Sequence, residues 1–336
     1  MRFETLPIAA RVPIVCFLLT ALLLLSALTA LGAGSTQQNW QDVIAILLGY
    51  GDLNSTTADI VLRIRLPRII LAALAGAALS LGGLVFQALL RNPLAEPYIL
   101  GISGGSAVGA IIGILLGLGH FPYLVLLSFA GSLVTLLLVL VIASGRAAMK
   151  RDSIILAGVM LNAFCGAVIM FFLSVTQDAR LHGVLFWLMG DLSMSSLWQN
   201  ALLAVFLAPC FTLILLLARP LNLLLLGEEM AANMGVNVRF VFLLLLCTAS
   251  LMVSATVSHT GLLGFIGLVI PHLLRLLLGP DHRVLVPACL FSGGAYLIGC
   301  DLLARTLPAQ GEMPVGVITA LIGVPLFIFL LQRTRR

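Results

Sequence analysis

Uncharged apolar stretches alternate with short polar connections along almost the whole chain. A helix that crosses a bilayer needs about 20 consecutive, mostly apolar residues. The predicted membrane spans are about 12–33, 67–90, 97–118, 121–144, 153–174, 197–218, 238–258, 260–278, 284–303 and 313–332. The pattern therefore predicts an all-α, polytopic membrane protein, in which residues 1–336 form a single transmembrane domain of about ten helices.

The composition agrees with this pattern. Hydrophobic residues make up 61% of the 336 positions and charged residues 9%, whereas a soluble domain is roughly half apolar and a quarter charged. These proportions exclude a soluble enzyme, a nucleic-acid-binding protein and a disordered scaffold. The six cysteines lie inside apolar stretches without CxxC spacing, which indicates packing residues rather than a disulfide framework or a metal cluster.

The basic residues predict how the helices are oriented. Cytoplasmic connections of membrane proteins are enriched in Arg and Lys, and an even number of spans places both termini on one side. With cytoplasmic termini, the basic residues that face inwards are Arg2, Arg11, Arg91, Arg146, Lys150, Arg151, Arg219, Arg239, Arg275, Arg283, Arg333, Arg335 and Arg336. Those that face outwards are only Arg63, Arg65, Arg68, Arg180 and Arg305. The distribution favours a protein whose two termini are cytoplasmic.

The first apolar segment has an alternative interpretation. Because Arg2 and Arg11 precede an apolar run that ends in small residues, the segment could be a cleaved signal peptide. The apolar run of a signal peptide usually has about 7 to 15 residues. The run here is longer, which favours an uncleaved first helix.

Two local patterns leave alternatives open. Four glycines interrupt the third span: Gly101, Gly104, Gly105 and Gly109. They indicate either close packing between helices or irregular backbone that lines a cavity. Residues 83–91 (GLVFQALLR) also resemble residues 267–275 (GLVIPHLLR), either as an internal repeat of the kind found in transporters or by chance in a leucine-rich chain.

The chain lacks the residues that would supply its own source of energy. Carriers coupled to protons or sodium expose ionisable residues near the membrane midplane, and the predicted spans place essentially none there. The five histidines are scattered without metal-ligand spacing, so neither a metal site nor a cofactor is expected. A P-loop needs a lysine after glycine, but the only lysine, Lys150, follows Met149. We therefore expect that the chain is not an enzyme and that any ATP is hydrolysed by another subunit.

The predicted cytoplasmic connection 219–239 is long enough to bind such a subunit. Residues 223–234 are expected to form a short amphipathic helix that ends at Gly235. Glu228 and Glu229 make this helix acidic, whereas helices that lie on a membrane surface are usually basic. The sequence therefore favours docking into a groove of a cytoplasmic partner.

The outward arginines are exceptions to the positive-inside rule. Arg63, Arg65 and Arg68 lead into the second span, and Arg305 follows the ninth. A guanidinium group forms bidentate pairs with carboxylates. These side chains therefore either receive acidic residues of an incoming protein, or pair with lipid headgroups or with acids of the same chain, such as Asp59 and Asp301.

Ordered motifs extend from about residue 60 to residue 332. They are RLPR (65–68), QALLRNPLAEPYILGISGG (87–105), LAGV (156–159), FWLMG (186–190), LNLLLLGEEMAANMGV (221–236), GFIGLVIPHLLR (264–275), GPDHRVLVP (279–287), DLLAR (301–305) and PVGVITALIGVP (314–325). Together these motifs resemble the FecCD family of permeases, the membrane subunits of type II ATP-binding cassette (ABC) importers for iron-siderophores, haem and cobalamin.

The resemblance implies the type II ABC importer permease fold, as a homodimer in the inner (cytoplasmic) membrane with ten helices per subunit. It also implies a translocation path at the dimer interface, two cytoplasmic ATP-binding subunits and an extracytoplasmic solute-binding protein. The cargo would be a metal chelate that crosses by alternating access. An iron complex, either a siderophore or haem, is the leading expectation, and cobalamin is the alternative.

By position, the resemblance also implies roles for individual residues. Arg65, Arg68 and Arg305 resemble the arginines that receive glutamates of the solute-binding protein. Asn92 and Leu94 resemble the cytoplasmic gate. A second gate element is expected near residues 149–152, where no residue is assigned.

Coupling to the ATP-binding subunit is implied for the acidic loop. The residues concerned are Leu226, Gly227, Glu228, Glu229 and Gly235. Met230 replaces the first alanine of the EAAxxxG pattern of the family.

Overall fold

A computed structural model describes residues 7–34, 39–144, 151–176, 178–308 and 311–334. Within these ranges the chain forms helices and no β-strand. The elements are α1 (Ile8–Gly32), α2 (Trp40–Leu47), α3 (Thr56–Asp59), the π-helix η2 (Ile60–Arg65), α4 (Leu66–Leu89), the 3₁₀-helix η3 (Pro97–Leu100), α5 (Ile102–Leu115), α6 (Tyr123–Ala143), α7 (Arg151–Val175), α8 (Asp178–Leu188), α9 (Leu197–Leu216), α10 (Ala218–Leu226), α11 (Glu228–Asn233), α12 (Val238–Thr260), α13 (Ile266–Leu278), α14 (His282–Thr306) and α15 (Val315–Thr334).

Helices of membrane-spanning length dominate the described part of the chain. Seven segments are long and apolar enough to cross a bilayer: α1, the continuous α3–η2–α4 segment, α6, α7, α9, α12 and α14. Three shorter apolar helices, α5, α13 and α15, overlap the remaining predicted spans. The predicted all-α, polytopic membrane fold is confirmed.

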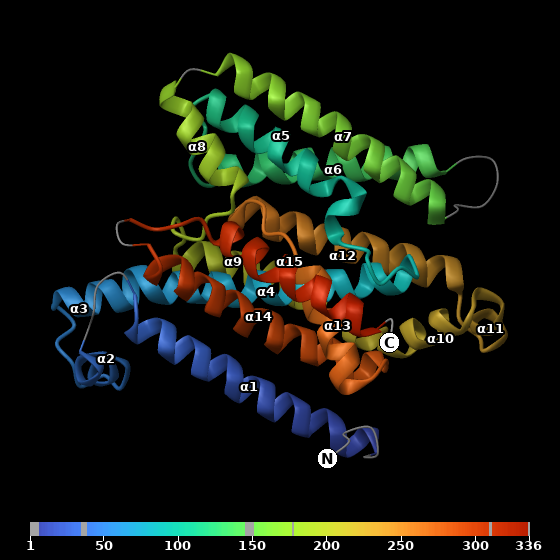
Figure 1. The fold of residues 1–336 in the computed structure, drawn as a ribbon, viewed down its shortest axis with the longest axis horizontal. Helices are drawn as coiled ribbons and strands as arrows, with labels where there is room; N and C mark the ends of the chain where they lie inside the picture. Colours follow the sequence, from blue (N-terminus) through green and yellow to red (C-terminus); the bar gives the residue numbers. More distant parts are fainter. Residues whose placement is uncertain (1–6, 35–38, 145–150, 177, 309–310, 335–336) are drawn as a thin grey trace.

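The helices lie side by side, with α4 in the middle of the bundle (Figure 1). Within the hydropathic windows, 83% of the residues of the α3–η2–α4 segment are buried, against 17% of those of α1 and 22% of those of α7. Figure 1 shows α1 along one edge of the molecule and the group α5, α6 and α7 along the opposite edge. The peripheral helices therefore present apolar side chains outwards, as a protein surrounded by lipid requires.

Small residues bring α4 against two other helices. A Cβ at Gly293 in α14 would overlap the carbonyl oxygen of Gly76 in α4. In the same way, a Cβ at Gly83 in α4 would overlap the carbonyl of Gly267 in α13. Gly83 and Gly267 open the two similar nonapeptides, so these segments pack directly against each other.

The two shorter interior helices begin where the backbone turns to positive φ. Gly101, with φ of 72°, precedes α5, and Phe265, with φ of 68°, precedes α13. Residues in the left-handed region do not continue an α-helix. The predicted spans 97–118 and 260–278 therefore start with irregular backbone.

The glycines of the third span differ in their surroundings. Gly101 is part of the irregular start. Gly105 and Gly109 lie against the backbone of α6, and Gly104 lies against Asn162 and Cys165 of α7. Most of the glycines therefore permit close packing between helices.

The two ends of the bundle differ in structure. Figure 1 places α2, α3 and α8 at one end, and α10 and α11 at the other. The first turn of α1 and the last turn of α15 lie towards the α10–α11 end (Figure 1). Of the basic residues used to predict orientation, Arg2, Arg146, Lys150, Arg335 and Arg336 lie outside the described residues.

Candidate functional site

The three arginines predicted to meet a binding protein are buried at the α2–α3 end. Arg65, Arg68 and Arg305 have between 3% and 4% of their surface exposed. Asp301 of α14 lies between two of them, because its Oδ1 accepts from Arg68 Nε at 2.6 Å and its Oδ2 accepts from Arg305 Nε at 3.0 Å. Pairing within the chain, which the sequence left open for Asp301, is the arrangement observed.

Two of these arginines, Arg65 and Arg305, cap the C-terminal end of α1. Arg65 Nη1 donates to the carbonyls of Leu31 and Gly32, at 2.7 and 3.0 Å. The two Nη atoms of Arg305 lie 3.3 and 3.4 Å from the carbonyls of Ala30 and Ala33. The last four carbonyls of a helix have no partner within it, and positive charge is favourable at this end. These hydrogen bonds therefore hold the C-terminal end of α1 against the rest of the bundle.

Glu312 is a member of this cluster that the sequence did not single out. Its Oε2 accepts from Arg68 Nη1 at 2.5 Å, and its side chain is 39% exposed. It lies on the connection between α14 and α15, in the segment GEMPVG. In the sequence, Glu312 is noticeable only as a single acid between two apolar runs. Only the fold brings it to Arg68. By contrast, Arg63 points outwards and forms an exposed pair with Asp59.

At the opposite end, the predicted coupling helix is broken in two. The backbone turns at Gly227, with φ of 132°, between α10 and α11. The expected single helix over 223–234 is therefore wrong, because glycine allows a conformation that ends α10. Gly235 adopts φ of 84° just after α11, as expected of a helix-terminating glycine.

Four of the five residues predicted to contact the ATP-binding subunit, all except Gly235, line a hollow of about 560 Å³. Its lining consists of Arg91, Leu226, Gly227, Glu228, Glu229, Met230 and Asn233. Leu226 and the two glutamates are exposed. The structure therefore places this acidic element beside the turn that follows α4, which contains the predicted gate residues.

That turn is held in a defined shape. Asn92 Oδ1 accepts from the backbone N–H of Leu94 at 2.9 Å, and the N–H of Asn92 donates to the carbonyl of Gln87. Leu94 projects outwards and is exposed. Arg91 has φ of 47°, which is rare for a residue with a side chain. In the second expected gate element, residues 149 and 150 lie outside the described residues.

A polar contact joins α10 to α14. Asn222 Nδ2 donates to Asp281 Oδ1 at 2.8 Å, and Asn222 Oδ1 accepts from the backbone N–H of His282 at 2.9 Å. Burial opposes ionisation of Asp281, but hydrogen bonds from Arg283 and Asn222 outweigh it and lower the pKa of the carboxyl to about 2. The aspartate is therefore a charged N-cap that fixes α10 against the start of α14.

Within the bundle, the two irregular segments bind each other. Glu96 accepts from the N–H of Phe265 at 2.7 Å. The hydroxyl of Tyr98 donates to the carbonyl of Leu263 and accepts from its N–H, both at 2.7 Å. These contacts satisfy backbone groups that neither helix can pair, as an apolar surrounding requires. The sequence did not reveal the role of Glu96, because its partner is a backbone group far along the chain.

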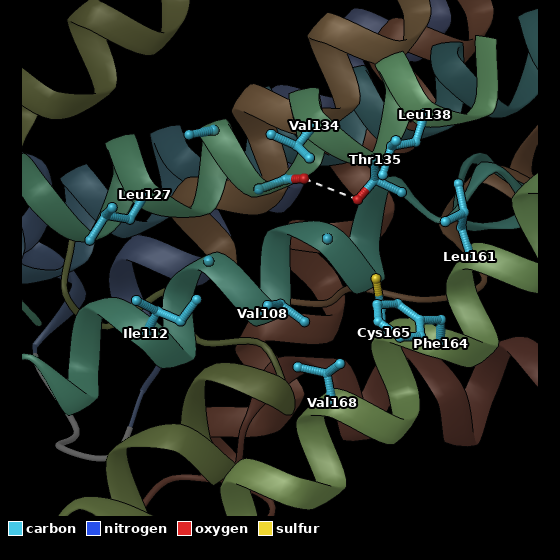
Figure 2. Close-up of a pocket in the computed structure, with 14 residues that line it drawn as sticks. Val108, Ile112, Leu127, Val134, Thr135, Leu138, Leu161, Phe164, Cys165 and Val168 are labelled. Atoms are coloured by element: carbon cyan, nitrogen blue, oxygen red, sulfur yellow. Dashed lines mark hydrogen bonds between the residues drawn. The ribbon is translucent and has the colours of Figure 1, made fainter. Parts of the chain in front are cut away.

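An apolar groove of about 390 Å³ lies between α5, α6 and α7 (Figure 2). Val108 and Ile112 line it from α5, and Phe164 and Val168 from α7 (Figure 2). The hydroxyl of Thr135 is occupied, because it donates to the carbonyl of Gly131 in its own helix. The groove therefore offers apolar contact. Among the described residues, no three His, Cys, Asp or Glu side chains are grouped as metal ligands.

Comparison with known proteins identifies the family that shares this architecture. The family model described as the FecCD transport family matches residues 21–333. The uncharacterized ABC transporter permease protein YvrB of Bacillus subtilis is 42% identical over 285 residues, which cover 83% of this chain and 80% of YvrB. The vitamin B12 import system permease protein BtuC of Salmonella typhimurium is 40% identical over 321 residues, or 95% of this chain and 94% of BtuC.

Solved structures agree. One described as an inward-facing conformation of a transporter assigned to the metal-chelate ABC type matches with a TM-score of 0.85 and 31% identity, covering 96% of this chain and 99% of the other. PsaBC from Streptococcus pneumoniae, in complex with Fab, shares only the fold, with a TM-score of 0.55, 19% identity and coverage of 79% of this chain and 89% of its own. The resemblance carried by the sequence motifs is confirmed, and the chain belongs to the FecCD transport family.

Proposed function

We propose that this chain is the membrane permease subunit of an ATP-driven importer that carries a metal chelate across the inner membrane. The observation that carries the proposal is the family match over residues 21–333. In the proposed assembly, two copies of the chain enclose the path, two ATP-binding subunits lie on the cytoplasmic side, and a solute-binding protein delivers the cargo. The permease itself hydrolyses no ATP.

The α10–α11 end is proposed to be cytoplasmic. Both terminal helices approach this end (Figure 1), and most of the basic residues fall in the connections assigned to it. Glu228 and Glu229 are exposed there beside the apolar Leu226. An acidic and apolar element of this size suits a groove on an ATP-binding partner.

The α2–α3 end is proposed to receive the solute-binding protein, through Arg65, Arg68 and Arg305. Because these three side chains are buried, they can bind the solute-binding protein only after they release partners within the permease. An incoming carboxylate reaches Arg68 only if Glu312 moves aside, and it reaches the other two only if they release carbonyls of α1. Docking is therefore an exchange of partners, in which acids of the binding protein replace acceptors of the permease.

A chelate brings its own metal ligands, so the path need not supply any. Similarity to BtuC over 95% of this chain supports cobalamin as the first compound to test. The motif resemblance favours an iron complex, so a siderophore or haem is the second candidate. In either case selection between chelates would rest with the solute-binding protein.

The test is reconstitution into proteoliposomes together with the ATP-binding subunits and the binding protein. We expect uptake of labelled cobalamin, ferric siderophore or haem that requires ATP and all three components. Vesicles whose ATP-binding subunit lacks its P-loop lysine serve as the control, and they should accumulate none. Accumulation by the permease alone would instead indicate a secondary carrier.

A further inference from the structure

Arg91 connects the turn that holds the predicted gate to the coupling segment. Its Nη2 donates to the carbonyl of Leu224 at 2.6 Å. Leu224 lies in the last turn of α10, where carbonyls have no partner within the helix and positive charge is favourable. Arg91 therefore caps α10 from a different part of the chain.

The other side of Arg91 is tied to the interior. Arg91 lies two residues beyond the end of α4, and Gln87 in the last turn of α4 donates through Nε2 to the carbonyl of Gly267 at 3.2 Å. Arg275 of α13 donates to Oε1 of the same glutamine. Gln87 also accepts the N–H of Asn92 through its backbone carbonyl. Polar contacts therefore run from α10 through Arg91 and the turn to α4 and α13.

The backbone of Arg91 suits this connection. With φ of 47°, it lies in the left-handed region that side chains usually avoid. Non-glycine residues persist in such conformations where the surrounding contacts determine them. The hydrogen bond to Leu224 on one side and that of Asn92 to Gln87 on the other provide contacts of this kind.

We propose that Arg91 is a positioning residue, which makes the Asn92–Leu94 turn follow the movement of α10 when the ATP-binding subunits open and close. This inference rests on the proposed function and deepens it. A rigid contact between a moving element and a turn transmits displacement. Without the contact, α10 moves and the turn does not follow.

The test compares Arg91→Ala with Arg239→Ala in the reconstituted importer. Arg239 is an exposed arginine in the first turn of α12, so the control removes the same charge near the same end. We expect Arg91→Ala to hydrolyse ATP but to take up about tenfold less chelate per ATP. Arg91→Lys, which keeps a cationic donor, should recover a large part of the loss.

Equal uptake per ATP in Arg91→Ala and Arg239→Ala would overturn the inference. Loss of co-purification with the ATP-binding subunit in Arg91→Ala would overturn it too, because Arg91 would then hold the partner rather than position the turn. Failure of the unaltered importer to take up any chelate would contradict the proposed function itself, so the two failures are distinguishable.

A second measurement needs no transported compound. Spin labels at Leu94→Cys and Leu226→Cys, both exposed positions, report the distance between the turn and the end of α10. In a background without the native cysteines, that distance should stay the same with and without ATP, and Arg91→Ala should broaden it. An equally narrow distribution in Arg91→Ala would contradict the inference.

Discussion

Arg68 Nε lies 2.6 Å from Asp301 Oδ1, and both side chains are buried where α4 meets α14 at the α2–α3 end. The two residues are 233 positions apart in the chain. A buried ion pair is costly to form, but it is more costly to break by removing one partner. Separating the two helices at this point would therefore leave buried charges without partners.

Asp301→Asn should destabilise the protein by about 3–5 kcal/mol, because two buried guanidinium groups lose their shared anion. Thermal unfolding of the purified protein in detergent measures the effect. Asp59→Asn is the matched control, because it removes the exposed pair with Arg63 and should cost no more than about 1 kcal/mol. Equal shifts in the two variants would show that the buried pair contributes little.

Glu312→Gln should strengthen binding of the solute-binding protein several-fold, because Arg68 loses a charged competitor and becomes available to an incoming carboxylate. The gain should shrink as salt is added. Surface plasmon resonance on the permease in nanodiscs measures both. Unchanged or weaker binding by Glu312→Gln would remove Arg68 from the docking surface.

Gly293→Ala should destabilise by roughly 1–3 kcal/mol, because the new methyl group would overlap the Gly76 carbonyl where α14 crosses α4. Gly299→Ala in the same helix is the control, because nothing lies within 4 Å of a Cβ there. The control should be neutral or stabilise by up to about 1 kcal/mol, since alanine favours helix. Chemical denaturation in mixed micelles compares the two, and a neutral Gly293→Ala would exclude tight packing at this crossing.

Replacing both Glu228 and Glu229 with lysine should detach the ATP-binding subunit or uncouple it. The change reverses the charge of the exposed face of α11. Co-purification and uptake measure the two outcomes. Asp42→Lys, an exposed change in α2 at the opposite end, is the control for added positive charge. Normal assembly and transport in the double variant would exclude α11 from coupling.

The lowered pKa of Asp281 predicts that the stability of the protein depends on pH. Its folded pKa, about 2, lies below the usual 3.8, so the folded state favours the ionised carboxyl. The stabilisation is complete above pH 4 and is lost as pH falls towards 2. We expect the melting temperature of Asp281→Asn to lie roughly 1–3 °C below that of the unaltered protein at pH 6. The gap should close near pH 2, and a gap independent of pH would contradict the assignment.

The sequence determined where the apolar helices lie and where an acidic segment connects two of them, because both depend on local composition. Apolar length decides whether a segment crosses a bilayer, so all ten predicted ranges overlap helices in the structure. The motifs likewise determined the family. The prediction of one helix over 223–234 was wrong because the helix is interrupted at Gly227. A glycine permits such a break but does not require it.

Only the tertiary structure decided which way the charged side chains turn. The sequence predicted that Arg65 and Arg305 lie on the extracytoplasmic side, but only the structure shows that both side chains are buried. Carbonyls of α1 accept from both arginines, and the carboxylate of Asp301 accepts from Arg305. Nothing in the sequence indicates the contact that Arg91 forms, because its acceptor, the carbonyl of Leu224, lies 133 residues further along the chain. A guanidinium binds whichever acceptor the folded helices bring within reach, and that depends on packing between distant segments rather than on neighbours in sequence.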